Sequence, residues 1–302
     1  MTPQVVCVGG AVADRKYHLV GPPEGGTSNP ARGSSAHGGV ARNVAENLAR
    51  LGVPVRLVSR VGDDDAGRAL KARLAAAGAD VTHVATTPGF DTAEYVAVLD
   101  PDGDLVIGVA AMDVFTAISA SDLDRALADG ADWLVLDCNL HPSVLAHGVA
   151  TGPRVAVDAV STAKVARLPG DLTGVDVLFC NGDEARAYLP HPAAGDADAA
   201  AHLVAAGAAA AVLTCGADGL VVADATGARV HPAVPADVVD VTGAGDALVA
   251  GTVAALLAGH DVDTAALAGA TLAAFTVESD ESVRTDLADI AADLPEFQEL
   301  LS

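Results

Sequence analysis

The 302-residue sequence predicts an α/β fold in which helices cover a mostly parallel central sheet. Short runs rich in valine and leucine recur along the chain, and an alanine-rich segment of helical length follows each of them. This alternation is typical of strands joined by crossover helices, which makes neighbouring strands parallel. The runs are VVCVGG, VRLVSRVG, WLVLDCN, RVAVDAV, VLFCN and AAVLTCG. A chain of this length buries a sizeable core, so we expect residues 1–302 to form one large domain.

Two segments depart from this pattern and predict a small β lid. Residues 14–37 are rich in Gly, Pro and Ser. Residues 93–112 contain two strand-like runs around the turn sequence DPDGD, which is a hairpin pattern. We expect the two segments to form a small sheet that projects over the functional site.

The charge of the chain disfavours two classes of partner. Forty acidic residues against seventeen basic ones give a formal net charge of −23, which repels nucleic acid phosphates and anionic membrane surfaces. No run approaches the roughly 20 apolar residues that cross a bilayer. The N-terminal MTPQVVCVGG lacks the basic and apolar regions of a signal peptide. We therefore expect a cytoplasmic protein, and any anionic ligand needs a locally built site.

The four cysteines favour reduced, buried, structural thiols over disulfides or metal ligands. Cys7, Cys138, Cys180 and Cys215 lie far apart, each in or beside an apolar strand-like run. Free cysteine is among the most buried residue types, and disulfides are rare in the cytosol.

Glycines and polar residues mark the C-terminal ends of the predicted strands. Ligands of parallel sheets bind at this edge, so we expect the functional site there. The residues concerned are Gly9, Asp137, Asn139, Asp158, Asn181 and Gly216.

The stretch VVDVTGAGDALVAG places a glycine-rich turn before a long apolar helix that ends at Gly259. Gly243, Ala244 and Gly245 fall at the helix N-terminus, where backbone N–H groups and the helix dipole bind anions. Asp246 lies in the first turn, where a carboxylate stabilises the helix. The functional alternative is a general base that accepts a proton from a hydroxyl attacking a phosphoryl group.

A second glycine turn opens HGGVARNVAENLARLG, a segment whose apolar residues share one helical face. Gly38 and Gly39 let a polar ligand approach the backbone, and Asn43 offers a donor and an acceptor to vicinal hydroxyls. The alternative is an ordinary turn followed by a solvated asparagine.

The run DVTGAGD resembles the DTGAGD signature of the ribokinase-like PfkB family of carbohydrate kinases. The second glycine turn resembles the sugar-binding signature of the same family, and Asp14 matches the family aspartate that binds two sugar hydroxyls. The two signatures occur in the family's order, so the chain is identified as a member over nearly its whole length. This resemblance implies a ribokinase-like three-layer fold, ATP as the phosphoryl donor, Asp246 as the base and residues 243–245 as the anion hole.

Further matches concern ATP and metal ions. NGDEA supplies Asn181 and Glu184, which match a family motif associated with phosphate and with Mg²⁺ bound through water. Asp240 matches a residue that in many relatives helps to bind a monovalent cation such as K⁺. The residues placed near ATP are Asn181, Thr214, Gly216, Gly219, Gly243, Gly245 and Ser279. A helix cap at Asn181 and a strand, turn and strand after Thr214 are the structural alternatives.

Within the family, the runs SNPARGSSAHGGVARNVAENLARLG, AAMDVF, VSTAK and TVESDESV are most similar to pseudouridine kinases. This implies transfer of the γ-phosphate of ATP to the 5′-hydroxyl of pseudouridine. The residues expected to hold the ribose are Asp14, Gly38, Gly39, Asn43 and Asn139. The loop with Lys16, Ser28 and Asn29 would contact the base, or serve only as a lid.

Two kinds of alternative stay open. The acceptor would be ribose, another nucleoside or a ketose in one case, and the chain would be a nucleotide-binding sensor without catalysis in the other. No Walker A sequence occurs, and CVGGAVAD departs from the dinucleotide fingerprint, which weakens an oxidoreductase interpretation. Relatives commonly dimerise through lid strands, and the apolar YVAVL run predicts a homodimer of that kind.

Overall fold

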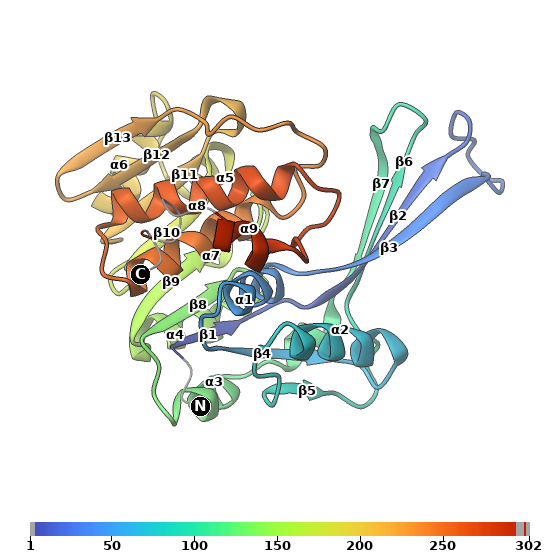
Figure 1. Ribbon diagram of the computed structural model, residues 1–302, viewed down its shortest axis with the longest axis horizontal. Coiled ribbons are helices and arrows are strands. Elements are labelled where there is room, and N and C mark those ends of the chain that lie inside the picture. The colour runs from blue at the N-terminus through green and yellow to red at the C-terminus, as the bar shows by residue number, and fades with distance from the viewer. Residues whose placement is uncertain (1–3, 294–298, 300–302) are drawn as a thin grey trace.

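The computed structural model describes residues 4–293 and residue 299, which form two sheets and two helical layers (Figure 1). Within these residues, the main sheet has the spatial strand order β13 (Gly227–His231), β12 (Leu220–Asp224), β11 (Ala210–Thr214), β10 (Val177–Asn181), β9 (Arg154–Asp158), β8 (Trp133–Asp137), β1 (Val5–Val8), β4 (Val55–Val61) and β5 (Val84–Thr86). The lid sheet has the order β3 (Ala31–Gly38), β2 (Val12–Leu19), β6 (Glu94–Leu99) and β7 (Leu105–Ala111).

The main sheet is parallel from β11 to β5, and β12 and β13 extend it antiparallel at one edge. In the lid sheet, β2 pairs parallel with β6 and antiparallel with β3, and β7 pairs antiparallel with β6. The predicted α/β class, the mostly parallel sheet and the small lid sheet are therefore confirmed.

Helices cover both faces of the main sheet (Figure 1). One layer contains α1 (Val40–Arg50), α2 (Asp65–Ala76), α7 (Ala244–Leu257), α8 (Val262–Val277) and α9 (Leu287–Asp293). The other contains α3 (Ala120–Leu127), α4 (Pro142–Thr151), α5 (Gly182–Tyr188) and α6 (Asp196–Ala205). The short 3₁₀ turns are η1 (Asp113–Ala117), η2 (Val165–Arg167) and η3 (Gly216–Asp218).

Alternate side chains of each central strand fill opposite sides of the core. In β1, Val5 and Cys7 face the layer that contains α1, whereas Val6 and Val8 face the layer that contains α3. All four side chains are fully buried. Successive side chains of a strand point to opposite faces, so a strand covered on both sides is apolar throughout. This explains why mostly apolar runs predicted β1, β8, β9, β10 and β11 correctly. The run at β4 also predicted a strand, although it contains Arg56, Ser59 and Arg60.

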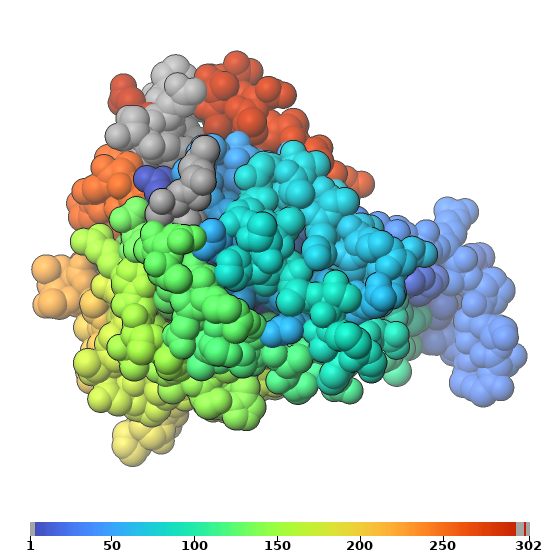
Figure 2. Space-filling view, turned by 90° about the horizontal axis from the view of Figure 1, so that it is seen from below, coloured from blue at the N-terminus to red at the C-terminus, as the bar shows by residue number. Residues whose placement is uncertain are grey.

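The lid sheet stands out from the body of the molecule (Figures 1 and 2). Its strands overlap the predicted segments, but β3 has the sequence ARGSSAHG, which contains few residues of high β propensity. It pairs with β2 at eight positions and is exposed over most of its length. Pairing with a neighbouring strand therefore defines β3.

Three of the four cysteines fit the predicted burial. Cys7, Cys138 and Cys180 are buried free thiols, whereas Cys215 is only half-buried and also free. The Cys215 Sγ lies 3.4 Å from Asp196 Oδ2, on the partly exposed side of its strand end. Within residues 4–293, no helix has the length and apolar character needed to cross a membrane.

A buried carboxylate ties three chain segments together where β8 ends. Asp137 Oδ2 accepts hydrogen bonds from the N–H of Gly10 at 2.8 Å and of Ala41 at 3.0 Å. Its Oδ1 accepts from the N–H of Asn139 at 2.9 Å. Gly9 has φ 153°, and a Cβ built on it would lie 2.3 Å from this carboxylate. Asp137 was expected at the ligand edge, and the structure instead gives it a buried role between backbone segments.

We expect Asp137→Ala to lower the free energy of unfolding by about 3 kcal/mol or more, because three buried N–H groups lose their acceptor. Asp137→Asn keeps one acceptor oxygen, so its loss should be smaller. Urea denaturation followed by circular dichroism measures both, with Asp132→Ala at an exposed site as the control. An unchanged midpoint for Asp137→Ala would contradict the role of this carboxylate.

Candidate active site

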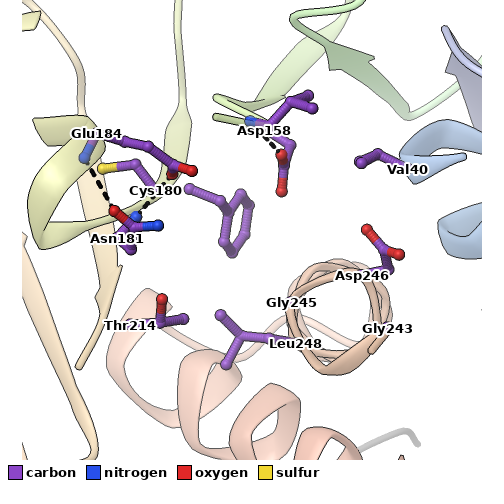
Figure 3. A pocket seen from close by; sticks show the side chains of 12 residues that line it. Val40, Asp158, Cys180, Asn181, Glu184, Thr214, Gly243, Gly245, Asp246 and Leu248 are labelled. Atoms are coloured by element: carbon purple, nitrogen blue, oxygen red, sulfur yellow. Dashed lines mark hydrogen bonds between the residues drawn. The ribbon is translucent and has the colours of Figure 1, made fainter. Parts of the chain in front are cut away.

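A pocket of about 180 Å³ opens at the C-terminal ends of β9, β10 and β11, beside the N-terminus of α7 (Figure 3). Its polar lining consists of Asp158, Asn181, Glu184, Thr214, Gly243, Gly245 and Asp246. Its apolar lining consists of Val40, Val160, Phe179, Cys180 and Leu248. Figure 3 shows Asn181 and Glu184 on one side of the pocket and Asp246 on the opposite side. The structure thus brings the predicted phosphate and metal residues together.

The N-terminus of α7 forms one wall of this pocket. Gly243 is the N-cap with φ 86°, a left-handed conformation that favours glycine. A Cβ on Gly243 would lie 2.0 Å from the carbonyl oxygen of Ser282, so the close approach also requires glycine. Ala244, Gly245 and Asp246 follow in the first turn, where N–H groups have no intrahelical acceptor. This turn presents donors and a partial positive charge to an anion.

Asp246 connects the phosphate side of the site to α1. Its Oδ2 accepts a hydrogen bond of 2.6 Å from the side-chain amide of Asn43. Burial raises the pKa of Asp246 to about 7; the charges of Asp137 and Asp14 act in the same direction, while Asn43 and Arg42 oppose it. A carboxyl group with this pKa can accept a proton at neutral pH. Asn43 is buried, so the interpretation as a solvated asparagine is wrong.

The Asn43 amide is held in place by Arg42. The guanidinium donates at 2.6 Å to Asn43 Oδ1 and at 2.6 Å to the carbonyl oxygen of His37, at the end of β3. It also pairs with Glu46 one turn later, a buried carboxylate shared with Arg50 and Arg73. With its oxygen occupied by Arg42, the Asn43 amide turns its NH₂ group toward Asp246.

The predicted sugar-binding residues lie next to this contact. Asp14 on β2 packs against Gly38, where a Cβ would overlap its carboxylate. Burial raises the pKa of Asp14 to about 6, although Arg42 and Lys16 lower it. Gly39 is the N-cap of α1. The negative charge of Asp14 also raises the pKa of Asp246, so the two carboxyl groups are close enough to interact electrostatically.

Asn139 is buried at the end of β8 and accepts a hydrogen bond of 2.5 Å from Lys164 Nζ. Lys164 precedes η2 and is half-buried, and burial lowers its pKa. The sequence analysis did not predict Lys164 as a site residue, although Lys164 belongs to the VSTAK run. Its position six residues after the strand-end Asp158 could have indicated it.

Asn181 and Glu184 form a capping box on α5. Asn181 Oδ1 accepts from the Glu184 N–H, and Glu184 Oε2 accepts from the Asn181 N–H, each at 2.9 Å. These contacts confirm the helix cap at Asn181. Asn181 and Glu184 also line the pocket. Burial raises the pKa of Glu184. In residues 4–293, no group of three or more His, Cys, Asp or Glu side chains is arranged to hold a metal ion.

The predicted residues that do not line this pocket are Asp14, Lys16, Ser28, Asn29, Gly38, Gly39, Asn43, Asn139, Gly216, Gly219, Asp240, Ala244 and Ser279. Ser28 and Asn29 lie in the connection between β2 and β3 at the outer end of the lid (Figure 1). The Asn29 side chain bonds to the backbone of Glu24 and Thr27, so it stabilises its own loop. Contact of Ser28 and Asn29 with the ligand stays a prediction.

Asp158 and Val160 line the pocket, although the sequence did not predict them as site residues. Burial raises the pKa of Asp158 well above its usual range, and the charge of Asp246 adds to this. Val160 has φ 66°, a rare conformation for a β-branched residue, and its N–H donates to Asp158 Oδ1 at 2.8 Å. Asp158 was recognised as a strand-end residue, and its strand position was the signal. The backbone of Val160 has no comparable signal in the sequence.

A helix N-terminus beside a buried carboxyl group, at the C-terminal edge of an α/β sheet, is the arrangement that a phosphotransferase requires. The comparisons with known proteins agree. Residues 2–287 match the model of the pfkB family carbohydrate kinases, and the chain belongs to this family. It is an ATP-dependent kinase of a sugar or nucleoside.

Relatives with known names differ in their acceptors. The chain is 34% identical over 234 residues to the pseudouridine kinase of Escherichia coli K12, covering 74% of each protein. It is 34% identical over 237 residues to the ATP-dependent ribose-1-phosphate kinase of Halopiger xanaduensis, covering 76% of each.

Solved structures confirm the ribokinase-like fold. The ribokinase of Arabidopsis thaliana, complexed with ribose and ATP, aligns with a TM-score of 0.82 over 100% of this chain and 99% of that one, at 22% identity. A carbohydrate kinase from Agrobacterium tumefaciens aligns with a TM-score of 0.79 over 97% of both chains, at 32% identity.

The raised pKa of Asp246 predicts a pH-dependent effect on stability. An unfolded aspartate titrates near pH 3.9, whereas the folded group titrates at about 7. Between these values only the unfolded state ionises, so stability falls as the pH rises and stays lower above pH 7. We expect Asp246→Asn to melt above wild type at pH 8, with a smaller difference at pH 5.5. Calorimetry with Asp289→Asn as an exposed control tests this, and equal differences at both pH values would contradict it.

Proposed function

We propose that the protein transfers the γ-phosphate of ATP to the 5′-hydroxyl of pseudouridine. The observation that carries the proposal is the Asn43–Asp246 hydrogen bond, which joins the acceptor side of the site to the phosphate side. The similarity to the pseudouridine kinase of Escherichia coli supports the choice of acceptor. So does 32% identity over 146 residues to a pseudouridine-metabolizing bifunctional protein of Schizosaccharomyces pombe.

In the proposed reaction, Asp246 accepts the proton of the attacking hydroxyl. The N–H groups of residues 243–245 at the start of α7 stabilise the charge on the transferred phosphoryl group. Asp246 lies in the first turn of α7, so the proposed base and the proposed phosphate site share one helical turn. Closure of the lid would exclude water, so that the alcohol is the only acceptor.

The nucleotide would extend from this turn toward β10 and β11. Thr214, Gly216, Gly219 and Ser279 are proposed to contact ATP, of which Thr214 lines the pocket. Mg²⁺ would neutralise phosphate charge, and Asn181 and Glu184 are placed to hold its waters. Their capping bonds fix the side chains without using both carboxylate oxygens of Glu184.

The ribose would be held by Asp14, Gly38, Gly39, Asn43 and Asn139. Asp14 offers a paired acceptor to two neighbouring hydroxyls, and Gly38 leaves room for it. Asn139 with the Lys164 ammonium adds polar contacts at the end of β8.

A phosphorylated sugar is the second candidate acceptor, because the similarity to the ribose-1-phosphate kinase is of the same size. Burial raises the pKa of Asp14 only to about 6, so this proposed acceptor ligand is mostly ionised at neutral pH. An acceptor with a doubly charged phosphate would meet repulsion from it. The neutral nucleoside is therefore preferred. A sensor without catalysis is the alternative of another class, and it predicts no ADP formation with any hydroxyl acceptor.

We also propose a homodimer that forms through the lid. All seven residues of β7 are exposed, and they include Leu105, Val106, Ile107 and Val109. An exposed apolar edge strand is a surface on which another sheet pairs. Sedimentation of the protein as a monomer at micromolar concentration would exclude this dimer.

For the acceptor, we expect the highest kcat/KM on pseudouridine in a panel with uridine, ribose, ribose 1-phosphate and fructose. ADP release measures turnover, and a reaction without Mg²⁺ is the blank. Preference for uridine or for any sugar would overturn the choice of pseudouridine. It would leave the kinase class unchanged.

For the base, we expect Asp246→Asn to lower kcat by at least about 10²-fold, the contribution of a positioned general base. ADP binding, measured by calorimetry, should persist because the helix amides remain. The wild-type kcat/KM should fall as the pH drops below about 7, where Asp246 becomes protonated. A folded Asp246→Asn enzyme with unchanged turnover, against the Asp289→Asn control, would refute the assignment.

A further inference from the structure

The carboxylate expected to bind a monovalent cation already has a cationic partner. Lys16 Nζ donates to Asp240 Oδ2 at 2.8 Å, although the two residues are 224 positions apart. The other oxygen, Oδ1, accepts from the Thr242 N–H at 2.8 Å and from the Thr242 hydroxyl at 2.6 Å. Both oxygens are therefore engaged, and a K⁺ ion would have to compete with a tethered ammonium for Oδ2. The residues present do not fit K⁺ at this carboxylate.

The partner comes from the lid. Lys16 lies on β2, two residues after Asp14, and side chains two apart in a strand point to the same face. The same face of β2 therefore carries the carboxylate proposed to hold the acceptor and the ammonium that reaches Asp240.

Asp240 also shapes the start of α7. Its bonds to the backbone and side chain of Thr242 close a tight turn one residue before the N-cap Gly243. The N–H groups that face the phosphate follow directly. An unneutralised Asp240 would lie only a few residues from that anion and would repel it.

We propose that Lys16 takes the place of a monovalent cation in this protein. Lid strand β2 carries the ammonium that bonds Asp240, and this contact neutralises the carboxylate and holds the turn that leads to Gly243. Lys16 is a positioning residue in this proposal, since it acts through Asp240 and the turn. Phosphoryl transfer is consequently independent of K⁺. The proposal rests on the kinase activity of the family and does not depend on which acceptor is phosphorylated.

The first test compares chloride salts of K⁺, Na⁺ and tetramethylammonium at equal ionic strength. We expect wild-type kcat to be the same in all three within about twofold. Lys16→Ala should lose about tenfold in tetramethylammonium, since Asp240 is left without its charged hydrogen-bond donor. K⁺ or NH₄⁺ should restore part of that loss, because a small cation can enter the space that the ammonium leaves. Arg32→Ala removes an exposed cation from the neighbouring lid strand β3 and is the matched control.

A second measurement needs no acceptor. Melting temperatures with saturating ADP should not depend on K⁺ for wild type, and K⁺ should raise the melting temperature of Lys16→Ala. Wild-type activity stimulated about tenfold by K⁺ would overturn the proposal. So would a folded Lys16→Ala enzyme whose activity and melting temperature do not respond to any monovalent cation. A wild type that phosphorylates no acceptor in any salt would count against the proposed function, while the melting experiment would still decide the role of Lys16.

Discussion

The arrangement of the site depends on the hydrogen bonds that the buried Asp137 carboxylate accepts. It accepts N–H groups from Gly10, which leads into β2, from Ala41, which opens α1, and from Asn139, which follows β8. A buried carboxylate is costly without donors, and three backbone donors supply that compensation. The acceptor side of the site is thus assembled around a group that does not itself line the pocket.

The acidic composition opposes binding of an anionic nucleotide, so the site needs local compensation of charge. A chain with a formal charge of −23 has to receive a nucleotide phosphate. Burial raises the pKa values of Asp14, Asp137, Asp158 and Asp246, so these groups carry less negative charge at neutral pH than aspartates in water. The N-terminus of α7 and the Arg42 guanidinium add positive potential. Local neutralisation therefore matters more for binding than the net charge of the surface.

The sequence predicted those features that a local residue pattern determines. It did not predict features that depend on contacts between distant segments. The apolar runs predicted the parallel strands because both sheet faces are covered, and the glycine turn before a long apolar run predicted the start of α7 at Gly243. The pattern of β3 contains no strand signal, since pairing with β2 alone extends it. The Lys16–Asp240 pair joins segments 224 residues apart, so no local pattern contains it. The bonds of the Asn29 side chain to the backbone of its own loop were likewise not predicted from the sequence.

Helix α7 is buried from Ala247 to Leu256, whereas most of β3 and all of β7 in the lid are exposed. The proposed phosphate site is therefore built on a packed helix, and the proposed acceptor residue Asp14 lies on a strand of the lid. Substitutions on the lid strands can change the contacts to the acceptor without disturbing the packing of α7. This separation is consistent with relatives of similar identity that are named for different acceptors, pseudouridine and ribose 1-phosphate.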